Sequence, residues 1–282
     1  MRIANLAGRA TLLTDDGAID IALGSGGRFL ADPRAVFRQW DKLLKWSMTA
    51  DPALAQPYDD ATLLTPVPEP RQIFAVALNY RPHTAEAGYE EPEEPLVFTK
   101  FPTCLTGPHG TIGLPAGHVD WEVEMVAVIG REAYRVPEEK GWDPVVALAV
   151  GQDLSERVSQ LAGRPAQFSL GKSFPGFGPV GPALVSVDEV PDRDDLELVC
   201  KLNGEVVQHD RTSSMIFPVP RLVSHISAVC PLRPGDLIFT GTPAGVGNRR
   251  TPQRFLTPAD TLVSRIEGLG EMRHRFRSRG GE

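Results

Sequence analysis

Prolines and glycines interrupt this chain along its whole length. Its 282 residues include 26 prolines and 27 glycines, and no short repeat orders them. Together they make up roughly 19% of the chain, against about 12% in an average protein. Because helix interiors exclude both residue types, the sequence predicts a globule of short strands and turns with few helices. A hydrophobic content of 41% argues against a disordered chain.

Charge and cysteine usage exclude several classes of function. The formal net charge of −7 repels phosphate, so we expect neither nucleic acid nor an anionic membrane as a partner. The three cysteines are widely spaced and form no CxxC pair, which argues against a disulfide scaffold or a cysteine-based zinc site. Residues 1–16 show no signal-peptide pattern, and no apolar run approaches the ~20 residues that span a bilayer. These features predict a cytoplasmic protein.

A proline-rich stretch divides the chain into two unequal parts. Residues 65–70 (TPVPEP) cannot form a helix and are typical of a linker. Before them, the apolar spacing after Asp32-Pro33 predicts an amphipathic helix that ends near Thr49. We therefore predict a small N-terminal α/β domain at 1–68 and a catalytic domain at 69–282.

The larger part contains many short apolar runs and little helical periodicity. Asn203-Gly204 between two such runs predicts a hairpin, because a type I′ turn needs positive φ at both central residues. Apolar spacing over 219–229 predicts one helix, and the arginine-rich segment 273–279 is interpreted as a solvated tail. Strands are expected at 73–78, 96–99, 121–129, 145–150 and 196–202, of which 73–78 and 96–99 are runs of the buried type. The fold class is therefore mixed, β-rich α+β.

Two glutamates lie two positions apart within the clearest predicted strand. Alternate strand residues share a face, so Glu122 and Glu124 point the same way, as do Val126 and Val128, which favour burial. The pair could belong to a wet edge strand. Carboxylates beside a buried face are better explained by a hard cation such as Mg²⁺ or Mn²⁺. Asp153, at the end of another apolar run, is a candidate third ligand, although a turn-capping role explains it equally well alone.

A histidine and a glutamate follow the first buried strand of the larger part. His83 and Glu86 are three positions apart and meet on one side of a helical turn. A carboxylate beside imidazole orients the ring and suits a general base. The alternative is an incidental pair in a surface turn, which the segment alone does not exclude.

Read in order, these segments resemble the fumarylacetoacetate hydrolase family over roughly residues 73–276. The matching pieces are Asn79-Tyr80 with His83 and Glu86, 95–100, Gly107-Pro108, Glu122 with Glu124, Asp153, Arg157 with Gln160, 171–174, 203–205, 211–217 and 240–243. The resemblance implies a β-roll catalytic domain, usually dimeric, behind a small variable N-terminal region. A homodimer is therefore expected.

The resemblance also implies a role for each matching residue. It implies that Glu122, Glu124 and Asp153 bind a divalent ion, Mg²⁺ or Mn²⁺, whose place Ca²⁺ could take in crystals. The implied catalytic residues are His83, Glu86 and Lys172, and the implied substrate-binding residues are Tyr80, Arg157, Gln160 and Thr242. Two departures blur the substrate: Pro175 and Val158 stand where the family often has aspartate.

The family's reactions form the same kind of enolate, so the motifs do not show which of these reactions the chain catalyses. Our leading hypothesis is metal-dependent hydrolysis of a C–C bond in an acylpyruvate-type or fumarylpyruvate-type 2-oxo acid, with His83 activating water. The alternatives are a decarboxylase or isomerase of 2-oxo diacids, of the oxaloacetate or 2-hydroxyhepta-2,4-diene-1,7-dioate type, and a catalytically silent relative. Five glutamates in 86–94 suggest an acidic lid that disfavours a second carboxylate on the substrate.

Overall fold

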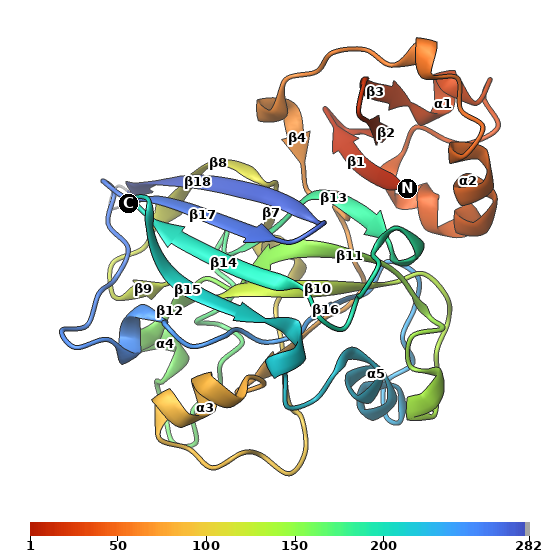
Figure 1. The fold of residues 1–282 in the computed structure, drawn as a ribbon. Helices are drawn as coiled ribbons and strands as arrows, with labels where there is room; N and C mark the ends of the chain where they lie inside the picture. Colours follow the sequence, from red (N-terminus) through yellow and green to blue (C-terminus); the bar gives the residue numbers. More distant parts are fainter. Residues whose placement is uncertain (280–282) are drawn as a thin grey trace.

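The computed structural model describes residues 1–279, and its largest element is a mixed sheet that runs through the whole molecule (Figure 1). The strand order is β3-β2-β1-β13-β11-β10-β16-β5-β6, with β4 paired to β1 and β7 paired to β13. Its strands are β1 (Arg2–Leu6), β2 (Arg9–Thr14), β3 (Gly17–Asp20), β4 (Leu63–Leu64), β5 (Ile73–Ala77), β6 (Leu96–Thr99), β7 (Leu105–Thr106), β10 (Val123–Ile129), β11 (Val145–Gln152), β13 (Gly178–Ser186) and β16 (Leu237–Phe239). The fold is sheet-rich α+β, as predicted.

A second, five-stranded sheet packs against the centre of the first. Its order is β15-β14-β17-β18-β8, and a short pair, β12 with β9, lies apart. The bounds are β8 (His109–Leu114), β9 (Val119–Asp120), β12 (Ser155–Glu156), β14 (Glu197–Leu202), β15 (Glu205–Arg211), β17 (Thr261–Ile266) and β18 (Gly270–Ser278). Alternation along β10 sends Val123 and Met125 into the core between the sheets, whereas Val126 and Val128 face the core shared with the N-terminal region.

The predicted hairpin is confirmed: β14 and β15 are joined by Asn203 (φ 53°) and Gly204 (φ 89°). The helix predicted over 219–229 is confirmed as α5 (Val219–Ser227). The other α-helices are α1 (Ile21–Gly24), α2 (Trp40–Ser47), α3 (Arg81–Ala87) and α4 (Arg157–Gln160). No helix among the described residues is both long and apolar enough to cross a membrane.

The single helix expected from Asp32 to Thr49 is two elements. A 3-10 helix covers Pro33–Gln39, and α2 begins only at Trp40. The backbone of Gln39, with φ −139°, interrupts the helical path between them.

The basic C-terminal segment is not a solvated tail over the described residues. Residues 270–278 form β18, which pairs with β17 and with β8. His274 and Phe276 are buried, whereas the alternating Arg273, Arg275 and Arg277 are exposed. The segment has the period of two of a half-buried strand, which its charge concealed.

The predicted run at 96–99 forms a strand but is not buried. β6 is the last strand of the large sheet, and Leu96 and Val97 are 48% and 38% exposed. As an edge strand it has a neighbour on one side only, and its apolar side chains line the cavity described below.

The N-terminal strands join the same sheet as the rest of the chain. β1 pairs antiparallel with β13, matching Arg2 with Val185, and β4 returns to pair with β1. Between β4 and β5, residues 65–72 form no helix or strand, in line with the expected linker. The division at 68/69 stays a prediction.

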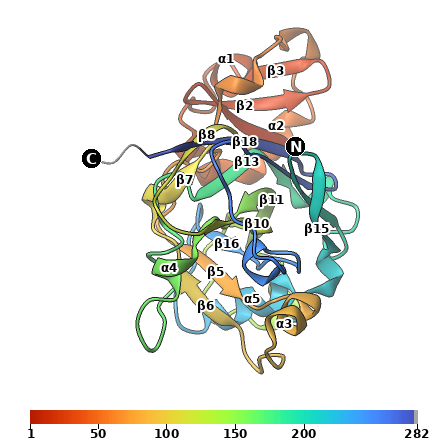
Figure 2. The ribbon, with the colours of Figure 1, turned by 90° about the vertical axis from the view of Figure 1, so that its left-hand side faces the viewer.

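Strand directions bring four chain segments to one edge of the large sheet, namely the edge formed by the ends of its central strands and not by an outermost strand. β5 and β16 are parallel, so both end at this edge. β10 runs against β16 and therefore starts there, and β11 runs against β10 and ends there. The edge thus collects the start of β10, the end of β11, the loop after β16, and α3, which follows β5 (Figure 2). Glu122, Glu124, Asp153, His83 and Glu86 lie on or directly beside these segments, whereas Arg157 lies on α4 and Lys172 in the chain that follows it.

Candidate metal centre and active site

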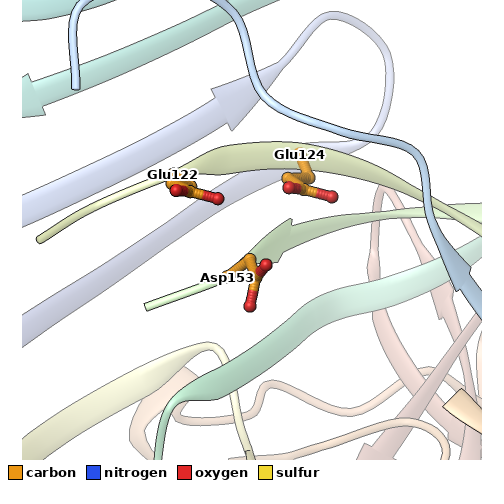
Figure 3. A group of neighbouring side chains, drawn as sticks. All are labelled: Glu122, Glu124 and Asp153. Carbon is orange, nitrogen blue, oxygen red and sulfur yellow. The ribbon is translucent and has the colours of Figure 1, made fainter. Parts of the chain in front are cut away.

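The three predicted ligands lie together at this edge. Glu124 is opposite Gly151 in the β10–β11 register, and the amide of Asp153 donates to the carbonyl of Glu122 at 2.9 Å. One carboxylate oxygen from each of Glu122, Glu124 and Asp153 lies within 4.8 Å of the others (Figure 3). All three residues are buried. The geometry brings the predicted triad together and excludes the wet-edge interpretation of the glutamates.

Buried cations balance most of this negative charge. Lys172 Nζ bridges Glu122 at 2.7 Å and Asp153 at 2.6 Å, and Arg157 reaches the other oxygen of Glu122 at 2.7 Å. Glu124 has no cationic partner among the described residues and accepts from the amide of Gly241 at 2.8 Å. The triad therefore has one carboxylate, that of Glu124, without an ion-pair partner among the described residues.

The two glutamates consequently differ in pKa. Burial alone would raise the pKa of Glu122, but Lys172 and Arg157 lower it to about 2. For Glu124, burial and then the charges of Asp153 and Glu122 raise the pKa well above its usual value. Without a cation, Glu124 favours its protonated form.

Two residues that the sequence analysis did not single out complete the charge network. Lys100 directly follows β6, is fully buried and donates from Nζ to Asp153 at 2.6 Å. Asp120 is also buried and accepts from Arg157 Nε at 2.9 Å and Nη2 at 2.7 Å. The Lys100–Asp153 and Asp120–Arg157 pairs join residues 53 and 37 positions apart, so no local sequence pattern predicts them. The only available signal was Lys100 at the end of the 95–100 segment.

A divalent ion fits the chemistry of this donor set. Three carboxylate groups are the ligands that Mg²⁺ and Mn²⁺ prefer. With Glu124 ionised, the network of Asp120, Glu122, Glu124, Asp153, Lys100, Arg157 and Lys172 carries one uncompensated negative charge. A bound divalent ion would turn that into one excess positive charge. Such a site attracts an anionic ligand.

The His83–Glu86 pair is present on α3, as its spacing predicted. His83 Nδ1 lies 3.3 Å from a Glu86 oxygen, and the Glu86 carboxylate also accepts from the amide of Gly245 at 3.1 Å. The left-handed Gly88 ends the helix two residues after Glu86. Glu86 therefore orients the ring from a fixed position and leaves Nε2 as the free nitrogen.

Tyr80 and Thr242, the other implied substrate contacts, lie behind the triad. Thr242 Oγ1 donates to the carbonyl of Val123 at 2.9 Å and accepts from Gln208 at 2.8 Å, so its hydroxyl is used within the protein. The Tyr80 hydroxyl is fully buried without a hydrogen-bond partner among the described residues. Burial, then Glu124, raises its pKa. Direct substrate contact by either residue stays a prediction.

A cavity of about 600 Å³ opens beside the triad. We call the part formed by Glu122, Arg157, Gln160 and His83 its inner end. Tyr89, Leu96, Val97 and Arg249, all exposed, form its outer end. The remaining lining side chains are mostly apolar, with Leu78, Phe98, Leu161 and Phe168 among them. The implied residues Arg157 and Gln160 are thus accessible to a ligand.

The sequence profile described as fumarylacetoacetate (FAA) hydrolase C-terminal matches residues 72–277. The chain belongs to this family. As a fumarylacetoacetate hydrolase family protein, it is a member of a group of enzymes whose named reactions include hydrolysis, isomerisation and tautomerisation.

Similar family members carry different names. A mitochondrial oxaloacetate tautomerase of Bos taurus is 39% identical over 216 residues, covering 76% of this chain and 69% of its own; the Homo sapiens tautomerase has the same figures. A Mycobacterium smegmatis structure given the name HpcE is 51% identical with a TM-score of 0.93, covering 99% of this chain and 100% of its own. Maleylpyruvate hydrolase from Sphingobium sp. SYK-6, solved with manganese(II) and pyruvate, is 28% identical with a TM-score of 0.82 and covers 99% of both chains.

The departures from the family pattern lie away from the cavity. Pro175 and Val158 are both exposed, and neither lines the cavity. The substrate is therefore not read directly by either position.

The acidic segment does not behave as the expected repulsive lid. None of Glu90, Glu91, Glu93 and Glu94 lines the cavity. Glu91 pairs with Arg81 at 3.6 Å and Glu94 with Arg221 at 2.7 Å, both outside it. Within 86–94, only Ala87 and Tyr89 contribute to the lining.

Proposed function

We propose that this enzyme isomerises a 2-oxo dicarboxylic acid by proton transfer, interconverting enol and keto forms. The observation that carries the proposal is a single oriented base, His83, in the same cavity as one member of a buried carboxylate triad. The similarity to proteins named oxaloacetate tautomerase supports proton transfer over bond cleavage.

Each group has a definable task in this reaction. Glu122, Glu124 and Asp153 would hold the divalent ion, which when bound supplies positive charge that stabilises an enolate-like transition state. Arg157 and Lys172 offset carboxylate charge, so a bound divalent ion would leave the inner end with one excess positive charge that holds the 2-oxo carboxylate. Gln160 offers a hydrogen bond beside it.

His83 moves the proton. With Nδ1 directed at Glu86, Nε2 takes the proton from the enol oxygen or returns it to the adjacent carbon. One O–H bond breaks and one C–H bond forms, so the substrate formula does not change.

A second candidate is hydrolysis of an acylpyruvate, in which His83 deprotonates a water that attacks the distal carbonyl. The structural similarity to maleylpyruvate hydrolase supports it. The same residues serve both reactions, so the substrate decides between them.

The deciding experiment follows three readings on the Mn²⁺-supplemented enzyme. These are ultraviolet loss of the oxaloacetate enol band, pyruvate release from oxaloacetate, and loss of the acetylpyruvate enol band with acetate formation. Enol loss without pyruvate supports the isomerase. Pyruvate from oxaloacetate identifies a decarboxylase, and acetate from acetylpyruvate identifies the hydrolase. No change in any reading, with Mn²⁺ bound, contradicts the proposal.

Three attributes of this enzyme are proposed with its reaction. The native ion is Mg²⁺ or Mn²⁺, the active form is a homodimer, and the protein acts in the cytoplasm. Manganese in the maleylpyruvate hydrolase structure supports the first. Sedimentation of the purified protein at micromolar concentration tests the second.

A further inference from the structure

Arg249 is a cationic side chain at the outer end of the cavity whose charge is not used within the protein. It lines the cavity and is exposed, and it forms no ion pair with any residue in 1–279. Its guanidinium lies 6.0 Å from the ring centre of Tyr89, another lining residue. By contrast, Arg157, the other lining arginine, is already bound to two carboxylates, Asp120 and Glu122.

The loop that carries Arg249 is fixed relative to the inner end. The amides of Gly247 and Asn248 donate to Asp120 at 2.7 and 2.9 Å, and Asp120 also binds Arg157. A side chain at Gly247 would clash with the carbonyl of Arg254, so the backbone there is tightly packed. The position of Arg249 is therefore set by the same carboxylate that anchors the inner end.

The charge and shape of the cavity then define a ligand. The inner end is suited to a 2-oxo carboxylate, the remaining walls are mostly apolar, and the outer end offers one unpaired cation. No acidic side chain other than that of Glu122 lines the cavity. A molecule with anionic groups at both ends and a hydrocarbon middle matches this order.

We propose that Arg249 binds the distal carboxylate of the substrate and selects 2-oxo dicarboxylates with an apolar middle over 2-oxo monoacids. This inference rests on the proposed function, because it takes the inner end as the 2-oxo acid site. Tyr89 holds the guanidinium over the cavity by a cation–π contact. Arg249 is a specificity residue and takes no part in the proton transfer.

The test uses two ligands of equal chain length, 2-oxoadipate and 2-oxohexanoate. They differ only at the distal end, which is a carboxylate in the first and a methyl group in the second. Their affinities for the Mn²⁺-loaded protein are measured by calorimetry. We expect the wild type to prefer the diacid about 5- to 10-fold, a modest factor because Arg249 is exposed. Arg249→Ala should reduce the preference below about 2-fold by weakening only the diacid, and Arg249→Lys should retain part of it.

Arg38→Ala is the matched control. It removes the same charge from the exposed face of the 3-10 helix Pro33–Gln39, which contributes no residue to the cavity, and should keep the wild-type preference. Raising the salt concentration should shrink the wild-type preference and leave the Arg249→Ala ratio unchanged.

The contrary outcomes are distinct. An unchanged preference in Arg249→Ala, or equal weakening of both ligands, overturns the role of Arg249 while the proposed function stands. Equal binding of the two ligands by the wild type does the same. A wild type that binds neither ligand overturns the inference, whereas the proposed function is judged separately by loss of the oxaloacetate enol band.

Discussion

The inner and outer ends of the cavity are built on opposite principles. At the inner end, buried carboxylates and cations are packed within hydrogen-bond distance, and almost every charge has a partner. At the outer end, the side chains are exposed and mostly apolar, and Arg249 has no counter-ion among the described residues. The inner end is organised to hold one fixed charge pattern, whereas the outer end is open to variation. We therefore assign the chemistry to the first and the choice of substrate to the second.

Removing a ligand from the triad should have the largest effect. Glu124→Gln takes away one of three anionic ligands, so we expect loss of the Mn²⁺-induced rise in melting temperature. Activity should fall about 10³-fold or more, since the ion contributes several kcal/mol of charge stabilisation. Arg249→Ala, at the outer end, should keep the full Mn²⁺ response. If both variants lose it, the two ends are not separate.

Removing the base should be nearly as costly but should spare the metal. His83→Ala is expected to lower turnover by about 10²- to 10⁴-fold, the usual contribution of general acid–base catalysis. The thermal shift with Mn²⁺ should stay at the wild-type size. His209→Ala, an exposed histidine on β15, is the control. A lost Mn²⁺ response in His83→Ala would place His83 in the metal cradle instead.

Lys100→Met should test whether the stability of the inner end depends on each buried carboxylate keeping its buried cations. The substitution leaves Asp153 buried with Lys172 as its remaining cation, and breaking a buried pair costs about 3 kcal/mol. Mn²⁺ should restore more stability to this variant than to the wild type, because the ion replaces part of the missing charge. Urea unfolding without Mn²⁺ measures the loss of stability, and unfolding with Mn²⁺ measures how much of it the ion restores. Lys42→Met, on α2, should change neither.

The smallest predicted effect is a gain in stability. In the metal-free protein the raised pKa of Glu124 means that the folded state holds a proton that the unfolded state releases above its own lower pKa. The contribution of Glu124 is therefore complete at acidic pH and is lost as the pH rises through the folded pKa. Glu124→Gln should be more stable than wild type in EDTA by about 1 kcal/mol at neutral pH, and more at pH 9 than at pH 5. A difference that shrinks with rising pH would contradict the charge argument.

The two ends also differ in how far the sequence predicts them. Glu122 and Glu124 are recognisable because a strand's period of two places them on one face, and His83 with Glu86 because a helical turn does the same. Lys100 and Asp120 are not, because their partners lie far away in the sequence, Asp153 after β11 and Arg157 on α4, and the strand order that brings them together is not encoded locally. The directions of β5, β10, β11 and β16 were needed to show that these segments share one edge.

The outer end was predicted least well. The charge of 86–94 suggested a repulsive lid, but ion pairs with Arg81 and Arg221 turn two of its glutamates away from the cavity. The apolar run at 96–99 suggested burial, but it faces the cavity from the edge of the sheet. The sequence gives the chemical type of a side chain. Whether that side chain faces solvent, ligand or core depends on neighbours that come from other parts of the chain.

Asp120 holds the outer loop through the amides of Gly247 and Asn248 and does not touch the side chains of that loop. Every residue except proline supplies the same amide. Position 249 can therefore accept other side chains while the loop keeps its course and the inner charge network keeps its partners. New substrate preferences are accessible to this scaffold by single substitutions, without any loss of the chemistry at the inner end.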